Sequence, residues 1–120
     1  MAEALITDPK EWRAALSRVV VLVRAGDTDS AQAQVAVMTR WTPPDAPYEA
    51  SVAEAFQAAA SAAGADRDVV AFEWLWKKAF NYWYAWGSGA SSGGEGAARG
   101  ELISQADAAY QRERRQLGLG

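Results

Sequence analysis

The chain contains no cysteine and no histidine. Without cysteine it cannot form disulfides, thiolate metal sites or iron–sulfur clusters, and it has no thiol nucleophile. Without histidine it lacks the side chain that most often serves as general base near neutral pH and as metal ligand. Any catalysis would have to use carboxylate, lysine, arginine, serine, threonine or tyrosine side chains. We therefore expect no catalytic residues, no metal site and no cofactor, and we predict that the protein is not an enzyme.

Long apolar runs are also absent. No stretch reaches the roughly 18 apolar residues that predict a membrane-spanning helix. Glu3 and Asp8 precede the first basic residue, and no apolar region follows, so the N-terminus does not resemble a signal peptide. We expect no membrane span and a cytoplasmic location. An excess of basic charge is missing as well, because the net charge is −3, which argues against nucleic acid as the partner.

Alanine and aromatic residues dominate what is present. Half of the 120 residues are hydrophobic and 22% are charged, a composition typical of one globular domain. Alanine favours helix but adds little core volume, so the six tryptophans must supply much of the bulk. The content of alanine, arginine and glycine favours a bacterial or phage source.

Apolar residues recur at helical spacing in five segments, which predicts an all-α fold. Pro9 and Pro47 suit the first turn of a helix, and the Thr42-Pro43-Pro44 segment ends one. Leu16, Val20, Phe56, Phe72 and Trp76 lie on the apolar stripes, so we expect all five to be buried. The predicted helices span about residues 9–25, 28–41, 47–63, 67–86 and 101–117.

Two short joins predict helical hairpins. Gly26 is placed to end the first helix, and Asp27 or Thr28 to cap the second. In the same way Gly64 is placed to end the third helix and Asp66 to cap the fourth. The sequence thus predicts a helical bundle of two αα-hairpins plus a C-terminal helix after a Gly-rich segment. The expected parts are a four-helix core over 1–86, a flexible Gly/Ser-rich segment over 87–100 and a C-terminal helix over 101–120.

The fourth predicted helix carries most of the aromatic residues, eight of thirteen lying between Phe72 and Trp86. A helix in a small domain buries only about a 100° arc, and these aromatics cover most of the circumference. One interpretation is a central helix covered on several sides by its own bundle. The other is that one aromatic face is buried by a partner, since aromatics are enriched at interaction hot spots. The candidate interface residues are Trp74, Lys78, Tyr82, Trp83, Tyr84, Trp86 and Tyr110.

The function favoured by this pattern is a non-enzymatic helical protein–protein interaction module. Such a module would be an adaptor, an accessory subunit or a small structural or assembly protein, with a protein partner or a homo-oligomer. The fifth helix has only a thin apolar stripe, so we expect Tyr110 to pack on aromatics of the fourth helix, from the same chain or from a partner copy.

Three alternatives stay open. The first is a small enzyme or ligand-binding domain with an aromatic pocket, which would need several polar groups aimed into one concavity. The second is single-stranded nucleic-acid binding, in which Trp74 and Tyr84 stack on bases and Lys77 and Lys78 meet phosphates. Against it, Glu73 lies one turn before Lys77 and is expected to pair with it. The third is a helix lying at a membrane interface, which usually needs a more basic polar face.

Overall fold

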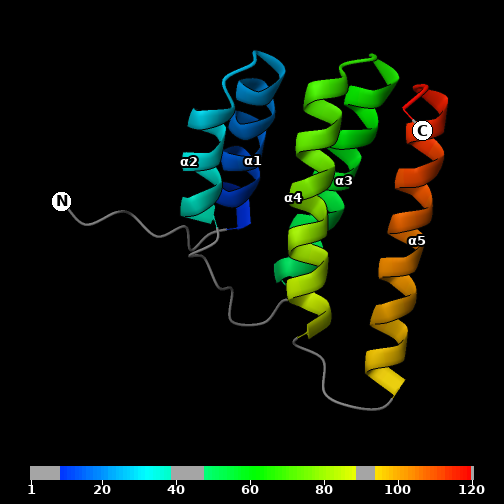
Figure 1. The fold of residues 1–120 in the computed structure, drawn as a ribbon. Helices are drawn as coiled ribbons and strands as arrows, with labels where there is room; N and C mark the ends of the chain where they lie inside the picture. The colour runs from blue at the N-terminus through cyan, green and yellow to red at the C-terminus, as the bar shows by residue number, and fades with distance from the viewer. Residues whose placement is uncertain (1–8, 39–47, 89–93, 120) are drawn as a thin grey trace. The chain divides into compact units, whose positions relative to one another are not determined.

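The computed structural model describes residues 9–38, 48–88 and 94–119, and all regular structure within them is helical. The predicted all-α bundle of hairpins is therefore confirmed. The five helices are α1 (Pro9–Arg24), α2 (Thr28–Met38), α3 (Tyr48–Ala65), α4 (Val69–Ser88) and α5 (Gly94–Gln116), as Figure 1 shows.

The chain divides into two compact units. The first comprises Met1–Tyr48 and holds α1 and α2, and the second comprises Glu49–Gly120 and holds α4, α5 and nearly all of α3. Each unit is described by itself below. That residues 1–86 form a single four-helix core stays a prediction.

The first unit is a hairpin with a glycine turn. Gly26 has a φ of 88°, its N–H donates to the carbonyl of Val23, and the N–H of Asp27 donates to that of Leu22. These two bonds satisfy the last carbonyls of α1. The carboxylate of Asp27 accepts from the N–H of Ser30 at 3.1 Å, which caps α2 as predicted.

Small aliphatic side chains form the core of the first unit. Leu16 is buried as predicted, but Val20 is only half-buried, because Val19 turns inward in its place. The described buried residues of this unit are Ala15, Leu16, Val19, Val23, Ala31 and Val35.

The second hairpin joins α3 to α4, but not at the predicted residues. Arg67, rather than Gly64, adopts the left-handed conformation, with a φ of 59°. The N–H of Arg67 donates to the carbonyl of Gly64, and the N–H of Asp68 donates to that of Ala63. Asp68, rather than Asp66, accepts the capping bond from the N–H of Ala71 at 3.3 Å. The helix therefore continues past Gly64, and the hairpin itself is confirmed.

Close packing, rather than a turn, accounts for glycine at position 64. A Cβ atom placed there would lie 2.9 Å from the ring atom Cδ1 of Phe72, and the Phe72 side chain is fully buried. The absence of a side chain at Gly64 thus lets the end of α3 approach the start of α4.

The helix α5 is longer than the sequence suggested. It begins at Gly94 instead of about Glu101, so the second half of the expected Gly/Ser-rich segment 87–100 is helical. Residues 89–93 lie outside the described part of the chain. Alanine and glutamate between the glycines favour helix and extend α5 backwards. At the other end, Gly118 has a φ of 76° and forms a capping turn, in which the N–H of Leu119 donates to the carbonyl of Arg114.

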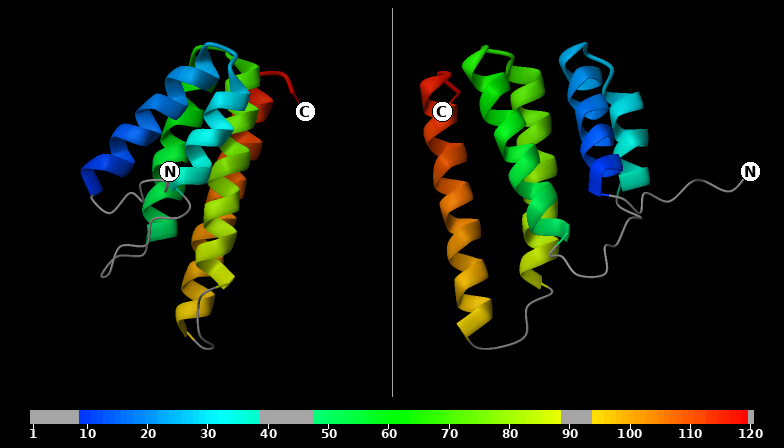
Figure 2. Two further views of the ribbon diagram at one scale, coloured as in Figure 1. Left: turned by 90° about the vertical axis from the view of Figure 1, so that its left-hand side faces the viewer. Right: turned by 180° about the vertical axis from the view of Figure 1, so that it is seen from behind.

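The core of the second unit is aromatic. Phe56 on α3 stacks on Tyr82 of α4, with ring centroids 5.7 Å apart. Phe56, Phe72 and Trp76 have no exposed surface, which confirms their predicted burial. Figure 2 shows α3, α4 and α5 side by side, and the contacts given below join α5 to both of its neighbours.

Candidate interaction groove

Tyr110 of α5 inserts among the aromatic side chains of α4. Its ring centroid lies 5.9 Å from that of Phe72, 5.3 Å from Trp76 and 5.6 Å from Phe80. The stacked, tilted and edge-on geometries are those that aromatic quadrupoles favour. The predicted packing of Tyr110 on the fourth helix is thus confirmed, and it occurs within one chain.

Polar contacts hold the same two helices together. The Tyr110 hydroxyl donates to Glu73 Oε2 at 2.8 Å, and Arg114 Nε lies 3.6 Å from Glu73 Oε1. The guanidinium of Arg114 also lies over the Tyr110 ring, 5.5 Å from its centroid. Burial and the hydrogen bond to Glu73 raise the pKa of Tyr110 above its usual value, because both disfavour the phenolate.

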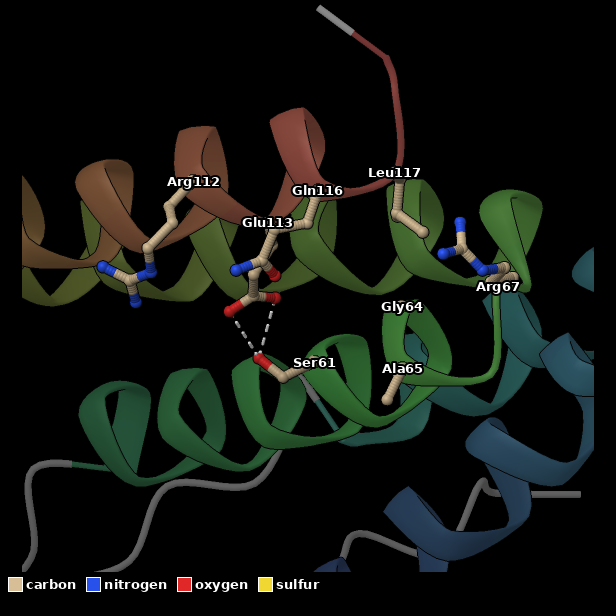
Figure 3. Close-up of a pocket in the computed structure, with 8 residues that line it drawn as sticks. All are labelled: Ser61, Gly64, Ala65, Arg67, Arg112, Glu113, Gln116 and Leu117. Atoms are coloured by element: carbon tan, nitrogen blue, oxygen red, sulfur yellow. Dashed lines mark hydrogen bonds between the residues drawn. The ribbon is translucent and has the colours of Figure 1, made fainter.

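A second polar cluster joins α5 to α3. Ser61 Oγ donates to the carboxylate of Glu113, 2.9 Å from both oxygens, as Figure 3 shows. Trp76 Nε1 donates to the same carboxylate at 3.3 Å. Glu113 therefore links α3, α4 and α5 through a set of hydrogen bonds that satisfies its partly buried charge.

This cluster borders a pocket of about 430 Å³. Arg67 and Arg112 lie at opposite ends of it in Figure 3. The Ser61 proton is already directed at Glu113, and Glu113 already accepts from Trp76, so both groups serve the packing of the helices. A hydroxyl activated for attack would need a free base and donors for the developing oxyanion. The arrangement therefore stabilises the packing of the helices.

A larger groove of about 770 Å³ runs between α4 and α5. Val70 is 67% exposed and Tyr84 is 57% exposed, so this groove presents apolar surface to solvent. Its described lining residues are Val69, Val70, Glu73, Trp74, Lys77, Phe80, Asn81, Tyr84, Asp107 and Tyr110. We call this surface the aromatic groove.

Two lysines lie on or beside the α4 wall of the aromatic groove. Lys78 Nζ lies over the Trp74 ring, 5.1 Å from its centroid, an attractive cation–π arrangement. Burial and the neighbouring Lys77 lower the pKa of Lys78. The predicted pairing of Glu73 with Lys77 is wrong, because Glu73 turns towards α5 and bonds Tyr110 and Arg114.

The structure brings only part of the predicted interface to the surface. Trp74, Tyr84 and Tyr110 line the aromatic groove, and Lys78 borders it through Trp74. Tyr82 and Trp83 are core residues, 6% and 4% exposed.

Position on the helix explains the burial of Tyr82 and Trp83. Tyr82 stacks on Phe56, and Trp83 Nε1 donates to Gln57 Oε1 of α3 at 3.2 Å. Both side chains therefore point towards α3, away from the aromatic groove. The side chain of Trp86 lies outside the described part of the chain.

Sequence reasoning missed Val70, Asn81 and Asp107 as groove residues. The signal for the α4 wall was present, because groove residues of α4 recur three and four residues apart, which predicts a second helix seam beside the core stripe. These positions are 70, 74, 77, 81 and 84. Asp107 carried no such signal, because only the packing of α5 brings it to the groove.

Within the described residues, no helix is both long and apolar enough to cross a membrane. The same residues contain no group of three or more acidic side chains placed to hold a metal ion. Comparisons with protein-family models, curated proteins and solved structures find no match to this chain.

Proposed function

We propose that this protein is a non-enzymatic helical interaction module that binds a helix of a protein partner in the aromatic groove. The observation that carries this proposal is the exposed apolar lining, above all Val70 and Tyr84, in a groove that the half-buried rings of Trp74, Phe80 and Tyr110 also line. Contiguous exposed apolar surface marks interaction sites. Such a module would serve as an adaptor, an accessory subunit or an assembly protein, and we expect it to act in the cytoplasm.

A helix is the element that fits this groove. α4 and α5 run antiparallel, since Tyr110 lies beside Phe80 while Arg114 lies beside Glu73. The positions 70, 74, 77, 81 and 84 follow the spacing of a helix-packing seam. α3 contacts α4 and α5 through Ser61 and Gln57, and a helix in the groove would add a fourth member to this three-helix unit.

The groove suits protein better than nucleic acid. Lys78 is held over Trp74, and Asp107 places a carboxylate on the opposite wall, where it would repel phosphate. A single-strand site needs a positively charged path alongside its stacking rings. The groove therefore lacks the positively charged path that such a site needs.

Site-specific photocrosslinking tests the proposal. Benzoylphenylalanine replaces Tyr84 in the groove, and in a matched variant it replaces Ala108, which is exposed on α5 but lines no described pocket. We expect the Tyr84 position to crosslink, in cells, to a helical protein segment with an apolar face. We expect the Ala108 position to give no such product, and Trp74→Ala to abolish the product from position 84.

Equal crosslinking at the two positions, or none at position 84, would overturn the proposed function. Crosslinked peptides identified by mass spectrometry also show whether the bound segment belongs to this chain or to another protein.

A further inference from the structure

We propose that the occupant of the aromatic groove is a second copy of this chain, held by reciprocal ion pairs between Lys77 of each copy and Asp107 of the other. This inference rests on the proposed function and names its partner. It follows from the charges at the groove and from the symmetry that two identical chains must obey.

Lys77 and Asp107 are the two charged groups that the groove leaves available. Both side chains are exposed, Lys77 on the α4 wall and Asp107 on the α5 wall. Among the described residues neither takes part in an ion pair or hydrogen bond, although both line one groove. Glu73, the other acidic residue in the lining, is occupied by Tyr110 and Arg114.

A two-fold axis parallel to the helices makes these two charges complementary. Such an axis places α4 of one copy against α5 of the other, and it does so twice. Lys77 then faces Asp107 of the second copy, and Asp107 faces Lys77 of the second copy. A two-fold axis across the helices would instead place α4 against α4 and α5 against α5, so that Lys77 would no longer face Asp107 of the second copy. The charges thus favour the two-fold axis that runs parallel to the helices.

Apolar contact supplies the affinity of this association, and the ion pairs set its register. Val70, Trp74 and Tyr84 are the apolar side chains of the α4 wall, and burying them removes apolar surface from water. Exposed ion pairs add little affinity by themselves, but like charges placed opposite one another disfavour the wrong arrangement.

Charge reversal tests the ion pairs. The mass of the full chain is measured across concentration by sedimentation or light scattering, at low salt, where exposed charges are least screened. We expect the wild-type chain to dimerise. Lys77→Asp and Asp107→Lys each replace two attractive pairs by two repulsive ones, so each is expected to raise the dimer dissociation constant about tenfold or more. The double variant Lys77→Asp/Asp107→Lys restores both pairs and is expected to dimerise like the wild type.

Arg18→Asp is the matched control, because Arg18 is exposed on α1 and its reversal changes the net charge as Lys77→Asp does. It is expected to leave the dissociation constant unchanged, and circular dichroism confirms that every variant is folded. A wild-type chain that is monomeric at all concentrations overturns the inference. A dimer that ignores the single reversals, or a double variant that stays monomeric, overturns it too.

The photocrosslinking experiment separates this failure from failure of the proposed function. A monomeric chain whose position 84 crosslinks to another protein refutes the second copy as occupant but supports the interaction module. A chain that gives no groove-specific crosslink refutes both.

Discussion

At the scale of single residues, two glycines in helices of the second unit have opposite surroundings. Gly64 lies against the Phe72 ring, whereas a Cβ atom at Gly100 in α5 would meet nothing within 4 Å. Helix propensity alone would favour alanine at both positions by about 1 kcal/mol. The difference between the two sites therefore isolates the effect of close packing.

We expect Gly64→Ala to destabilise the protein by about 1–3 kcal/mol, because the new methyl group must displace a buried ring. Gly100→Ala, the control, is expected to raise the free energy of unfolding by up to about 1 kcal/mol. Urea unfolding followed by circular dichroism measures both changes. If Gly64→Ala instead stabilised the protein, the start of α4 would have to move aside for the new methyl group at little cost in free energy.

Tyr110 gives the protein a sensitivity to alkaline pH. Its folded-state pKa is raised above the usual value of about 10, so the unfolded chain ionises first. Stability from the Tyr110 hydroxyl is therefore fully present below pH 10 and is lost as pH rises from 10 through the folded-state pKa. We expect the melting temperature of the wild type to fall more steeply above pH 10 than that of Tyr110→Phe. Parallel curves for the two proteins would contradict this assignment.

At the scale of elements, α5 covers the aromatic side of α4. Tyr110 packs on Phe72, Trp76 and Phe80, and Glu113 accepts the indole N–H of Trp76. The apolar stripe of α5 is thin, since Ala106 is the only residue of this helix that is buried among those described. Its docking thus depends on Tyr110 and on the hydrogen bonds of Glu73 and Glu113.

A chain that stops at Ser88 lacks α5 and is expected to expose Trp76. We expect its tryptophan emission to shift to longer wavelength and its solubility to fall, because the uncovered aromatics form an apolar patch. A chain that ends at Gln116 keeps Tyr110 and Glu113 and serves as the control, with unchanged emission. Unchanged emission in the shorter chain would mean that α5 does not shield Trp76 in solution.

At the scale of the whole molecule, the two units have unequal cores. The described buried side chains of Met1–Tyr48 are alanine, valine and leucine, whereas those of Glu49–Gly120 include five aromatic residues. Short helices are marginal in water unless packing supports them. A hairpin of two helices with small side chains has little apolar area to bury.

We therefore expect residues 49–120, expressed alone, to unfold cooperatively on heating. Residues 1–48 alone are expected to show weak helicity and no cooperative transition. Circular dichroism of the two fragments beside the full chain measures this difference. A cooperative transition in fragment 1–48, or none in fragment 49–120, would contradict the ranking of the two cores.

The sequence by itself determined the helices and the hairpins of this protein. Local signals carry that information: the spacing of apolar residues, the caps at Asp27 and the prolines act within a few residues of the chain. They also predicted that Phe56, Phe72 and Trp76 are buried, because each lies on a continuous apolar stripe.

Only the tertiary structure decided which aromatics lie in the core and which line the groove. α4 is apolar around most of its circumference, so its own pattern could not separate the buried Trp83 from the exposed Tyr84. That choice depends on where α3 and α5 pack. For the same reason, the local pattern could not show that Gly64 is needed for close packing and not for a turn. It also could not show that Glu73 bonds Tyr110 and not its neighbour Lys77. Contacts between residues distant in sequence depend on the packed neighbour, which local spacing does not encode.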